Sequence, residues 1–321
     1  MNAIAVDGKT IAEKLRGRIM SDVAHLQVEH NFTPGLAVVL VGKDPASSVY
    51  VRTKARQARA VGFKSQQFVL PSNVDEAELL KLIKTLNTDD SVDGILVQLP
   101  LPGHIDRWRV LEAIDPAKDV DGFHPYNIGR LAAGQPCLAP CTPLGVVHLI
   151  KSVARDLSGL DVVIIGRSNI VGKPLAVLLG DAGCTVTGAQ LQTRNLPDIC
   201  RKADIIVAAA GCAGLVRGDW IKLGAIVIDV GINRVFDSIG TEKLVGDVAF
   251  DEVSSRASYI TPVPGGVGPM TVAYLLANTF KAAVSRRGLS LVTRHDVRHK
   301  APLSGASTDN VSVQFALDRA S

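Results

Sequence analysis

Tyr50 and Lys54 are the residues of this sequence whose types and spacing best suit proton transfer. They stand four positions apart in a predicted helix, so their side chains lie on one face. A lysine amine can take up or release a proton, and a neighbouring phenol can orient or relay it. An ordinary amphipathic helix, with Tyr50 in the core and Lys54 reaching water, explains the same pair, and on this stretch alone we favour that interpretation.

The pair follows a predicted junction between a strand and a helix. Residues 36–41 are an uninterrupted apolar run, which indicates a buried strand. An Asp-Pro dipeptide at 44–45 ends this strand, and either Ser47 or Ser48 is expected to cap a helix that continues to Gly62. The two candidate residues therefore stand in the first turns of a helix that begins at a strand end.

Two more polar positions adjoin predicted buried segments. Residues 94–98 predict a strand that ends in the polar Gln98, and open α/β sheets bind ligands at the carboxyl ends of their strands. A glutamine bonded to the loop backbone explains this local pattern equally well. Further along, Asp115, Asp119 and Asp121 lack the spacing of a calcium loop, so a turn with one functional carboxylate is the better interpretation.

The second half of the chain alternates short strands and helices. A predicted strand at 161–165 runs into Gly166, Arg167 and Ser168, and a helix follows. A glycine-rich turn at such a junction places backbone N–H groups where a phosphate can bind. The turn departs from G-x-G-x-x-G, so a tight structural turn is the rival interpretation. A βαβ series, and hence a Rossmann-like sheet, is indicated by further strands at 184–187, 205–208 and 226–230.

The region that selects between NAD and NADP lies after the second strand of this series. An NAD site carries an acidic residue about 20 positions beyond the glycine turn. Residues 188–192 contain no acid, whereas Arg167, Lys173 and Arg194 are cations nearby in the sequence. This charge balance suits a 2′-phosphate and predicts NADP as the cofactor.

A loop at 262–269 combines three prolines with three glycines. Such a loop is rigid and poor in side chains, so its backbone can approach a ligand closely. A rigid turn between domains is the other interpretation, and both can hold. Thr271 is expected to cap a final helix that ends near Arg286, and the loss of periodicity over 287–321 predicts a disordered tail.

The composition bounds the fold class. The chain has 321 residues, of which 47% are hydrophobic, 21% charged and only 4% aromatic. Its core must therefore be aliphatic, which suits parallel sheets covered by helices. We predict an α/β protein of two domains: a catalytic domain at 1–140 that the helix at 271–286 completes, and a Rossmann-like domain at 141–270.

Charge and cysteine content argue against several classes of protein. Most of the net charge of +4 lies beyond residue 285, and no basic stripe with aromatic residues indicates a nucleic-acid partner. The five cysteines lack the spacing of zinc ligands, so we expect no metal site and reduced thiols in the cytoplasm. Residues 1–14 do not look like a signal peptide, and no segment is apolar over the roughly 18 residues of a membrane span.

Four motifs together resemble the bifunctional methylenetetrahydrofolate dehydrogenase/cyclohydrolase family over roughly residues 3–285. The motifs are Tyr50-Val51-Arg52-Thr53-Lys54 and the segments at 94–102, 118–122 and 262–271. The resemblance implies a folate site in a cleft between two domains, and a homodimer paired through the cofactor domains. It also implies NADP-dependent oxidation of 5,10-methylenetetrahydrofolate to the methenyl form, followed by hydrolysis to 10-formyltetrahydrofolate in the same site.

The resemblance further implies a role for each matching residue. Lys54 would be the central catalytic residue, Tyr50 would stack on the folate, and Gln98 would hydrogen-bond Lys54. Asp121 would bind the N–H and amino donors of the pterin ring. The remaining implied folate contacts are Pro264, Gly265, Gly266 and Thr271. The implied NADP contacts are Gly166, Arg167, Ser168 and Ile232.

The chain departs from the family pattern after the second strand of the cofactor domain. Where members carry a His-Ser or His-Arg pair that meets the 2′-phosphate, this chain has Gln190 and Leu191. Leu191 cannot donate a hydrogen bond, so Arg167, Lys173 or Arg194 would have to compensate. One alternative is therefore an enzyme that is mainly a cyclohydrolase with weakened NADP binding. The other is a catalytically idle, dinucleotide-binding regulatory protein.

Overall fold

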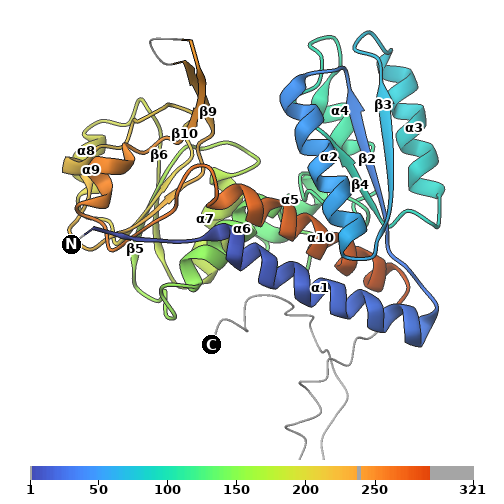
Figure 1. Ribbon diagram of the computed structural model, residues 1–321, viewed down its shortest axis with the longest axis horizontal. Coiled ribbons are helices and arrows are strands. Elements are labelled where there is room, and N and C mark those ends of the chain that lie inside the picture. Colours follow the sequence, from blue (N-terminus) through green and yellow to red (C-terminus); the bar gives the residue numbers. More distant parts are fainter. Residues whose placement is uncertain (1, 237–239, 290–321) are drawn as a thin grey trace, which may run out of the picture.

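The computed structural model describes residues 2–236 and 240–289 (Figure 1). Two α/β units lie side by side, each is built on a parallel sheet, and long helices join them. The predicted fold class is therefore confirmed. Of the predicted tail, only residues 287–289 fall within the described residues.

The first sheet has three parallel strands in the order β3-β2-β4. The central strand β2 (Gly35–Val41) is buried along its whole length, as its apolar run predicts. Strands β3 (Lys64–Leu70) and β4 (Gly94–Val97) pair with it on either side. Helix α2 (Pro45–Ala60) follows β2, and helix α3 (Glu76–Thr88) follows β3.

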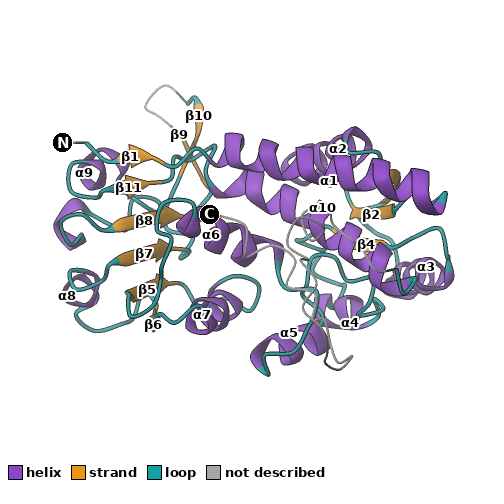
Figure 2. Cartoon of the chain, turned by 90° about the horizontal axis from the view of Figure 1, so that it is seen from below, coloured by secondary structure: helices purple, strands orange, loops and turns teal. Residues whose placement is uncertain are grey.

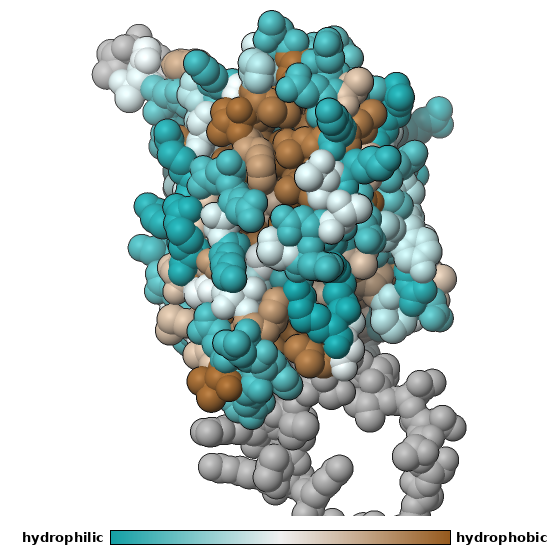
Figure 3. Space-filling view, turned by 90° about the vertical axis from the view of Figure 1, so that its right-hand side faces the viewer, coloured by the Kyte–Doolittle hydropathy of each residue, from teal (hydrophilic) through white to brown (hydrophobic). Residues whose placement is uncertain are grey.

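Strand β3 forms one outer edge of this sheet, and Val69 on it is 58% exposed. The helical spacing of Leu79, Ile83 and Leu86 predicts an inward-facing stripe on helix α3, and all three are buried. Figure 3 views this end of the molecule, where hydrophobic side chains are visible between hydrophilic ones.

The second sheet has six strands in the order β1-β11-β8-β7-β5-β6, and every neighbouring pair is parallel. Helices lie on both faces of the sheet, as the Rossmann-like prediction requires (Figure 2). The strand bounds are β1 (Ile4–Ala5), β5 (Asp161–Ile165), β6 (Thr185–Ala189), β7 (Ile205–Ala208), β8 (Ile226–Asp229) and β11 (Tyr259–Ile260).

Strand β1 shows that the chain begins in the second sheet. Ile4 pairs with Tyr259 and Ala5 pairs with Ile260 on β11. The predicted domain limits, 1–140 and 141–270, placed these first residues with the first unit instead. A strand of two residues carries no periodicity, so only its pairing reveals where it belongs.

Three long helices connect the two units. Helix α1 (Gly8–His30) leads from β1 to the first sheet, α6 (Cys141–Lys151) leads into the second unit, and α10 (Val267–Arg286) returns to the first. Helix α10 packs against both α1 and α6, and Tyr274 in its middle is 1% exposed. One hydrophobic core therefore runs from the first unit through these helices into the second.

The shorter elements surround these cores. An antiparallel hairpin of β9 (Asn233–Phe236) and β10 (Glu242–Val245) extends away from the second unit (Figure 1). The sequence patterns did not predict it, because most side chains of the two strands are exposed and neither strand forms an apolar run. The other bounds are α4 (Arg107–Glu112), α5 (Pro125–Ala132), α7 (Gly172–Asp181), α8 (Leu196–Cys200), a 3₁₀ turn (Gly218–Trp220) and α9 (Phe250–Ser254).

The predicted cap of α2 is wrong. Asp44, rather than Ser47 or Ser48, occupies the cap position, and its carboxylate accepts the N–H of Ser47 at 2.7 Å. Pro45 fits the first helical position because the N–H it lacks would have no partner there. The helix therefore begins directly after the dipeptide that ends the strand.

Three other helix starts also differ from prediction. The residue types at Ser72, Asn73 and Thr142 also predict helix caps, as does Thr271. The first helical residues are instead Glu76, Cys141 and Val267. Thr142 and Thr271 instead lie inside helices and hydrogen-bond each other at 2.9 Å. Capping signals are local, and tertiary contacts decide between neighbouring candidates.

Candidate active site

Lys54 and Gln98 meet at the carboxyl edge of the first sheet. Helix α2 follows β2 and Gln98 follows β4, which is the neighbouring parallel strand. Lys54 Nζ donates to Gln98 Oε1 at 3.0 Å, and Gln98 Nε2 donates to the carbonyl of Leu99 at 2.7 Å. The second bond fixes the amide so that its oxygen faces the lysine. Lys54 is only 7% exposed, so the interpretation in which it reaches water is wrong.

Tyr50 lies one helical turn before Lys54 on the same face of α2. It is 40% exposed and does not belong to the core, contrary to the interpretation favoured from the local sequence. An exposed aromatic ring beside a buried amine is suited to stacking against a flat ligand.

Asp121 is brought towards the same edge by the segment before it. The N–H of Ile95 in β4 donates to the carbonyl of Lys118 at 2.7 Å, so residues 118–121 run beside the strand. Burial raises the pKa of the Asp121 carboxyl, and the positive charge of Lys54 opposes this rise. Within the described residues, the Asp121 carboxylate accepts no hydrogen bond. It is therefore available to a ligand.

The other charged residues of this loop support the backbone. Asp119 is buried and accepts the N–H of His124 at 2.8 Å and the side-chain amide of Asn127 at 3.0 Å. Lys118 is buried too, and its Nζ donates to the carbonyls of Leu86 and Asp89. Of the aspartates in this loop, Asp121 is therefore the one that fits the prediction of a single functional carboxylate.

Helix α10 holds the backbone just before Asp121 and the segment at Ala139 that packs against Gly122. The buried side chain of Asn278 donates to the carbonyls of Val120 and Ala139 at 2.9 and 2.8 Å. Gly122 has φ +75, and a Cβ there would lie 2.5 Å from the carbonyl carbon of Ala139. The sequence analysis missed Asn278, because nothing in the pattern of a helix more than 150 residues away signals this contact.

The proline- and glycine-rich loop is held against the start of α1. Gly266 donates its N–H to the carbonyl of Pro262 at 2.9 Å, and Gly8 lies so close to the carbonyl of Gly266 that a Cβ at Gly8 would collide with it. Gly265 has φ +115, a conformation that favours glycine. The loop is thus rigid where it meets α1, and its contact with folate stays a prediction.

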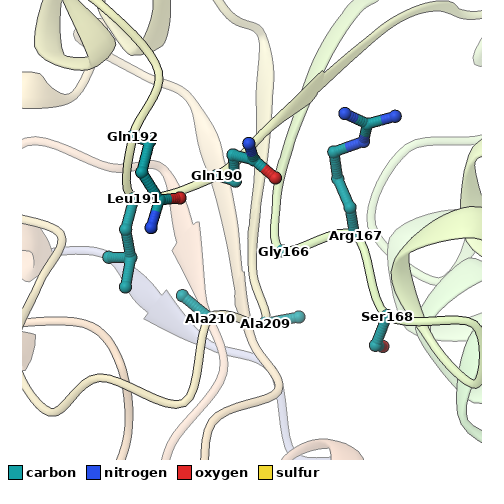
Figure 4. Close-up of a pocket in the computed structure, with 8 residues that line it drawn as sticks. All are labelled: Gly166, Arg167, Ser168, Gln190, Leu191, Gln192, Ala209 and Ala210. Carbon is teal, nitrogen blue, oxygen red and sulfur yellow. The ribbon is translucent and has the colours of Figure 1, made fainter.

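A pocket lies at the carboxyl ends of β5, β6 and β7 in the second unit. The Gly166–Ser168 turn forms one side, and the segment after β6 forms the other (Figure 4). Its lining residues are Gly166, Arg167, Ser168, Gln190, Leu191, Gln192, Ala209 and Ala210. Ile232 is 50% exposed and is not one of them.

The pocket fits a dinucleotide that carries phosphate. Gly166 has φ +124, and a Cβ there would collide with the carbonyl of Ala209, so only glycine allows this turn. Arg167 is the one charged residue among those that line the pocket, and its guanidinium makes no hydrogen bond or ion pair to the described residues. Leu191 is 51% exposed at the rim and offers no donor. An exposed cation without acidic neighbours in the lining agrees with the prediction of NADP.

The described residues hold neither a metal-ion cluster nor a membrane-spanning helix. Across residues 2–236 and 240–289, no cluster of three His, Cys, Asp or Glu side chains could hold a metal ion. Each helix in these ranges is too short or too polar to cross a membrane. The candidate ligand regions are therefore the one around Lys54 and the one around Gly166.

Comparison with known families gives two matches that cover most of the chain. Residues 6–121 match the catalytic domain of tetrahydrofolate dehydrogenase/cyclohydrolase, and residues 140–287 match the NAD(P)-binding domain of the same family. The bifunctional protein FolD of Nitrobacter hamburgensis is 56% identical over 90% of this chain and 98% of its own. FolD 1 of Rhizorhabdus wittichii is 58% identical over 89% of this chain and 97% of its own.

Solved structures agree with these matches. The bifunctional FolD of Campylobacter jejuni is 51% identical, with a TM-score of 0.85 over 88% of this chain and 99% of its own. FolD of Trypanosoma brucei was solved with NADP cofactor and an inhibitor. It is 41% identical, with a TM-score of 0.85 over 90% of this chain and 100% of its own. The chain belongs to the tetrahydrofolate dehydrogenase/cyclohydrolase family.

Proposed function

We propose that Lys54 is the central catalytic residue of two successive reactions that share one site. The enzyme oxidises 5,10-methylenetetrahydrofolate to the methenyl form with NADP and hydrolyses that product to 10-formyltetrahydrofolate. The observation that carries the assignment of residues is the buried Lys54 Nζ, which lies 3.0 Å from Gln98 Oε1 and whose charge acts on Asp121, a carboxylate that accepts no hydrogen bond from the described residues.

In the oxidation, bound NADP supplies the hydride acceptor. The carbon that loses hydride stands between two nitrogens, so positive charge develops on the folate. A protonated Lys54 would oppose this charge, whereas a neutral amine would not. Gln98 Oε1 can accept a hydrogen bond from either form, because both forms of lysine carry N–H donors. Lys54 can therefore change its protonation state without losing its position.

In the hydrolysis, water must add to the methenyl carbon and lose a proton. The neutral amine of Lys54 would act as general base towards this water. Asp121 would hold the pterin through its ring N–H and amino donors, and Tyr50 would stack on the ring. Pro264, Gly265, Gly266 and Thr271 would line the remainder of the folate site, in the cleft between the units.

The cofactor would be held by the turn after β5. Gly166 donates its own N–H to the carbonyl of Ala189 and, lacking a side chain, lets the backbone approach a phosphate closely. Ser168 would offer a backbone N–H to the phosphate, and Arg167 would offer the positive charge that a 2′-phosphate requires. Ile232, which is exposed after β8, would contact another part of the cofactor. In this assignment Arg167 compensates for the donor that Leu191 lacks.

The enzyme would be a cytoplasmic homodimer paired through its cofactor units. All five cysteines are free thiols, which suits a reducing compartment. Phe236 and Leu244 lie on one face of the β9–β10 hairpin and are 69% and 38% exposed. A second copy of the chain would cover these side chains.

Turnover of 5,10-methylenetetrahydrofolate with NADP and with NAD, together with hydrolysis of supplied methenyltetrahydrofolate, tests the function. We expect both activities, with preference for NADP. Hydrolysis without NADP reduction would favour an enzyme that is mainly a cyclohydrolase, and the absence of both would favour an idle regulatory protein.

Lys54→Ala tests the mechanism. It should lower both activities by at least about a hundredfold, the range of a general acid or base, while Lys64→Ala, at an exposed lysine on β3, should not. Folate turnover that survives Lys54→Ala would contradict the assignment.

A further inference from the structure

Asp247 binds a backbone turn that adjoins the cofactor pocket. The residue lies just after the β9–β10 hairpin and is completely buried. Its carboxylate accepts the N–H groups of three successive residues, Ala210, Gly211 and Cys212, at 2.6, 2.8 and 3.0 Å. Successive amides that converge in this way form an anion-binding nest. Here the protein's own side chain occupies the nest.

The turn that Asp247 holds continues the wall of the pocket. Ala209 and Ala210 line the pocket directly after β7, between the Gly166–Ser168 turn and the segment after β6 (Figure 4). Gly211 has φ +68, so the backbone reverses there and turns its amides towards Asp247. A shift of this turn would displace the surface that faces the cofactor.

The same carboxylate also reaches the base of the hairpin. Asn233, the first residue of β9, donates its side-chain N–H to Asp247 Oδ1 at 2.8 Å. Asp229, at the end of β8, accepts the backbone N–H of Asp247 at 2.9 Å. A Cβ at Gly231 or Gly246 would collide with the carboxyl group of Asp247 or Asp229, so both glycines make room for this cluster.

The donor set of Asp247 requires a carboxylate. Oδ2 accepts from Ala210 and Gly211, and Oδ1 accepts from Cys212 and Asn233. All four donors are neutral, and no lysine or arginine of the described ranges forms an ion pair with it. An asparagine has one acceptor oxygen, so its NH₂ group would have to face two of these donors.

We propose that Asp247 is a positioning residue for NADP binding, which fixes the Ala209–Cys212 wall of the pocket and joins that wall to the base of the β9–β10 hairpin. The inference rests on the proposed assignment of this pocket to NADP. Asp247 acts through the backbone amides that it holds, because it is buried behind the wall.

The experiment compares Asp247→Asn with the wild type by calorimetric titration of NADP and by hydrolysis of supplied methenyltetrahydrofolate. If the wall keeps its binding arrangement in only a tenth of the molecules, the Kd for NADP rises about tenfold. We expect this rise together with a smaller change, less than about threefold, in the rate of hydrolysis. Asp251→Asn, at an exposed carboxylate on α9, is the matched control and should leave the Kd unchanged.

A second variant keeps the test decisive if Asp247→Asn folds poorly. Asn233→Leu removes one donor to Asp247 from a residue that does not line the pocket, and we expect the Kd for NADP to rise about threefold. An unchanged Kd in both variants, or losses of hydrolysis and NADP binding that are equal in size, would overturn the inference. Wild-type protein that binds NADP but does not turn over folate would contradict the proposed function and leave this inference standing.

Discussion

Lys54 hydrogen-bonds an amide oxygen, whereas buried lysines are ordinarily paired with carboxylates. The carboxylate that interacts electrostatically with this lysine is Asp121. Burial raises the pKa of the Asp121 carboxyl, and the positive charge of Lys54 lowers it. Asp119, two residues earlier, accepts the backbone N–H of His124 and the side-chain amide of Asn127, which lie at the start of α5. Asp119 and Asp121 thus differ in role. Asp119 accepts hydrogen bonds from nearby residues of the chain, whereas Asp121 accepts none from the described residues.

Asp121→Asn tests the carboxylate at this scale. The variant keeps the shape of the side chain and removes the charge that would accept the pterin donors. A hydrogen bond to a charged group contributes about 1.5–3 kcal/mol, so the KM for folate should rise roughly 10- to 100-fold while the Kd for NADP stays the same. Steady-state kinetics measure the first and titration the second. Asp75→Asn, at an exposed aspartate before α3, is the control, and a KM equal to that of the wild type would remove Asp121 from the site.

The ends of parallel strands are the elements that create both ligand regions. In the first sheet, β2 and β4 deliver Lys54 and Gln98 to one edge. In the second, β5, β6 and β7 deliver the lining of the cofactor pocket. Strand β8 ends differently, because Asp229 at its end is buried and accepts the N–H groups of Gly231, Asp247 and Val248.

The end of β8 should make stability depend on pH. Burial raises the pKa of Asp229 from 3.8 to about 6, and the neighbouring Asp247 adds to this rise. A pKa raised by folding means that the charged form destabilises the native state. The stability that protonated Asp229 contributes is fully present below about pH 4 and is lost as the pH rises through 6. Protonation between pH 7 and pH 5 should therefore stabilise the wild type by about 1 kcal/mol.

Denaturant unfolding of the wild type and of Asp229→Asn at pH 7 and pH 5 measures this contribution. The free energy of unfolding of the wild type should rise relative to that of Asp229→Asn as the pH falls, because the asparagine cannot take up a proton. Asp251→Asn shows how an exposed carboxylate behaves under the same conditions. A difference that is equal at both pH values would contradict the prediction.

The whole molecule combines two α/β units on a shared core, with one hairpin that extends outside it. The core explains how α10, near the end of the chain, can fix the loop of Asp121 in the first unit. The hairpin presents Phe236 and Leu244 on the face that also carries the Arg234–Glu242 ion pair. Exposed apolar side chains with a charged pair beside them are typical of a protein–protein interface.

Phe236→Asp tests the proposed dimer. Burial of a phenylalanine contributes about 1.5–3 kcal/mol, and a symmetric dimer buries two, so the dimer should weaken by more than about a hundredfold. Sedimentation velocity should then show monomer at concentrations where the wild type is a dimer. Leu223→Asp, at a residue 77% exposed elsewhere on the same unit, should remain a dimer. A monomeric wild type would contradict the homodimer, and a dimeric Phe236→Asp would move its interface away from the hairpin.

The sequence by itself determined the main strands and helices of both units, the glycine turn and the candidates Tyr50, Lys54, Gln98 and Asp121. Apolar runs and helical spacing record which face of each element is buried, and this information is local. The helix caps were predicted wrongly because several capping residues stand close together and the choice depends on what lies nearby in space.

Only the tertiary structure decided which residues meet. Lys54 contacts Gln98 because two neighbouring strands end at one edge, β1 joins the second sheet because it pairs with β11, and Asp247 reaches Asn233 through a hairpin that periodicity does not reveal. Each of these contacts joins segments that are separate along the chain. Their partners are set by how the chain returns through space, which no local pattern of residue types encodes.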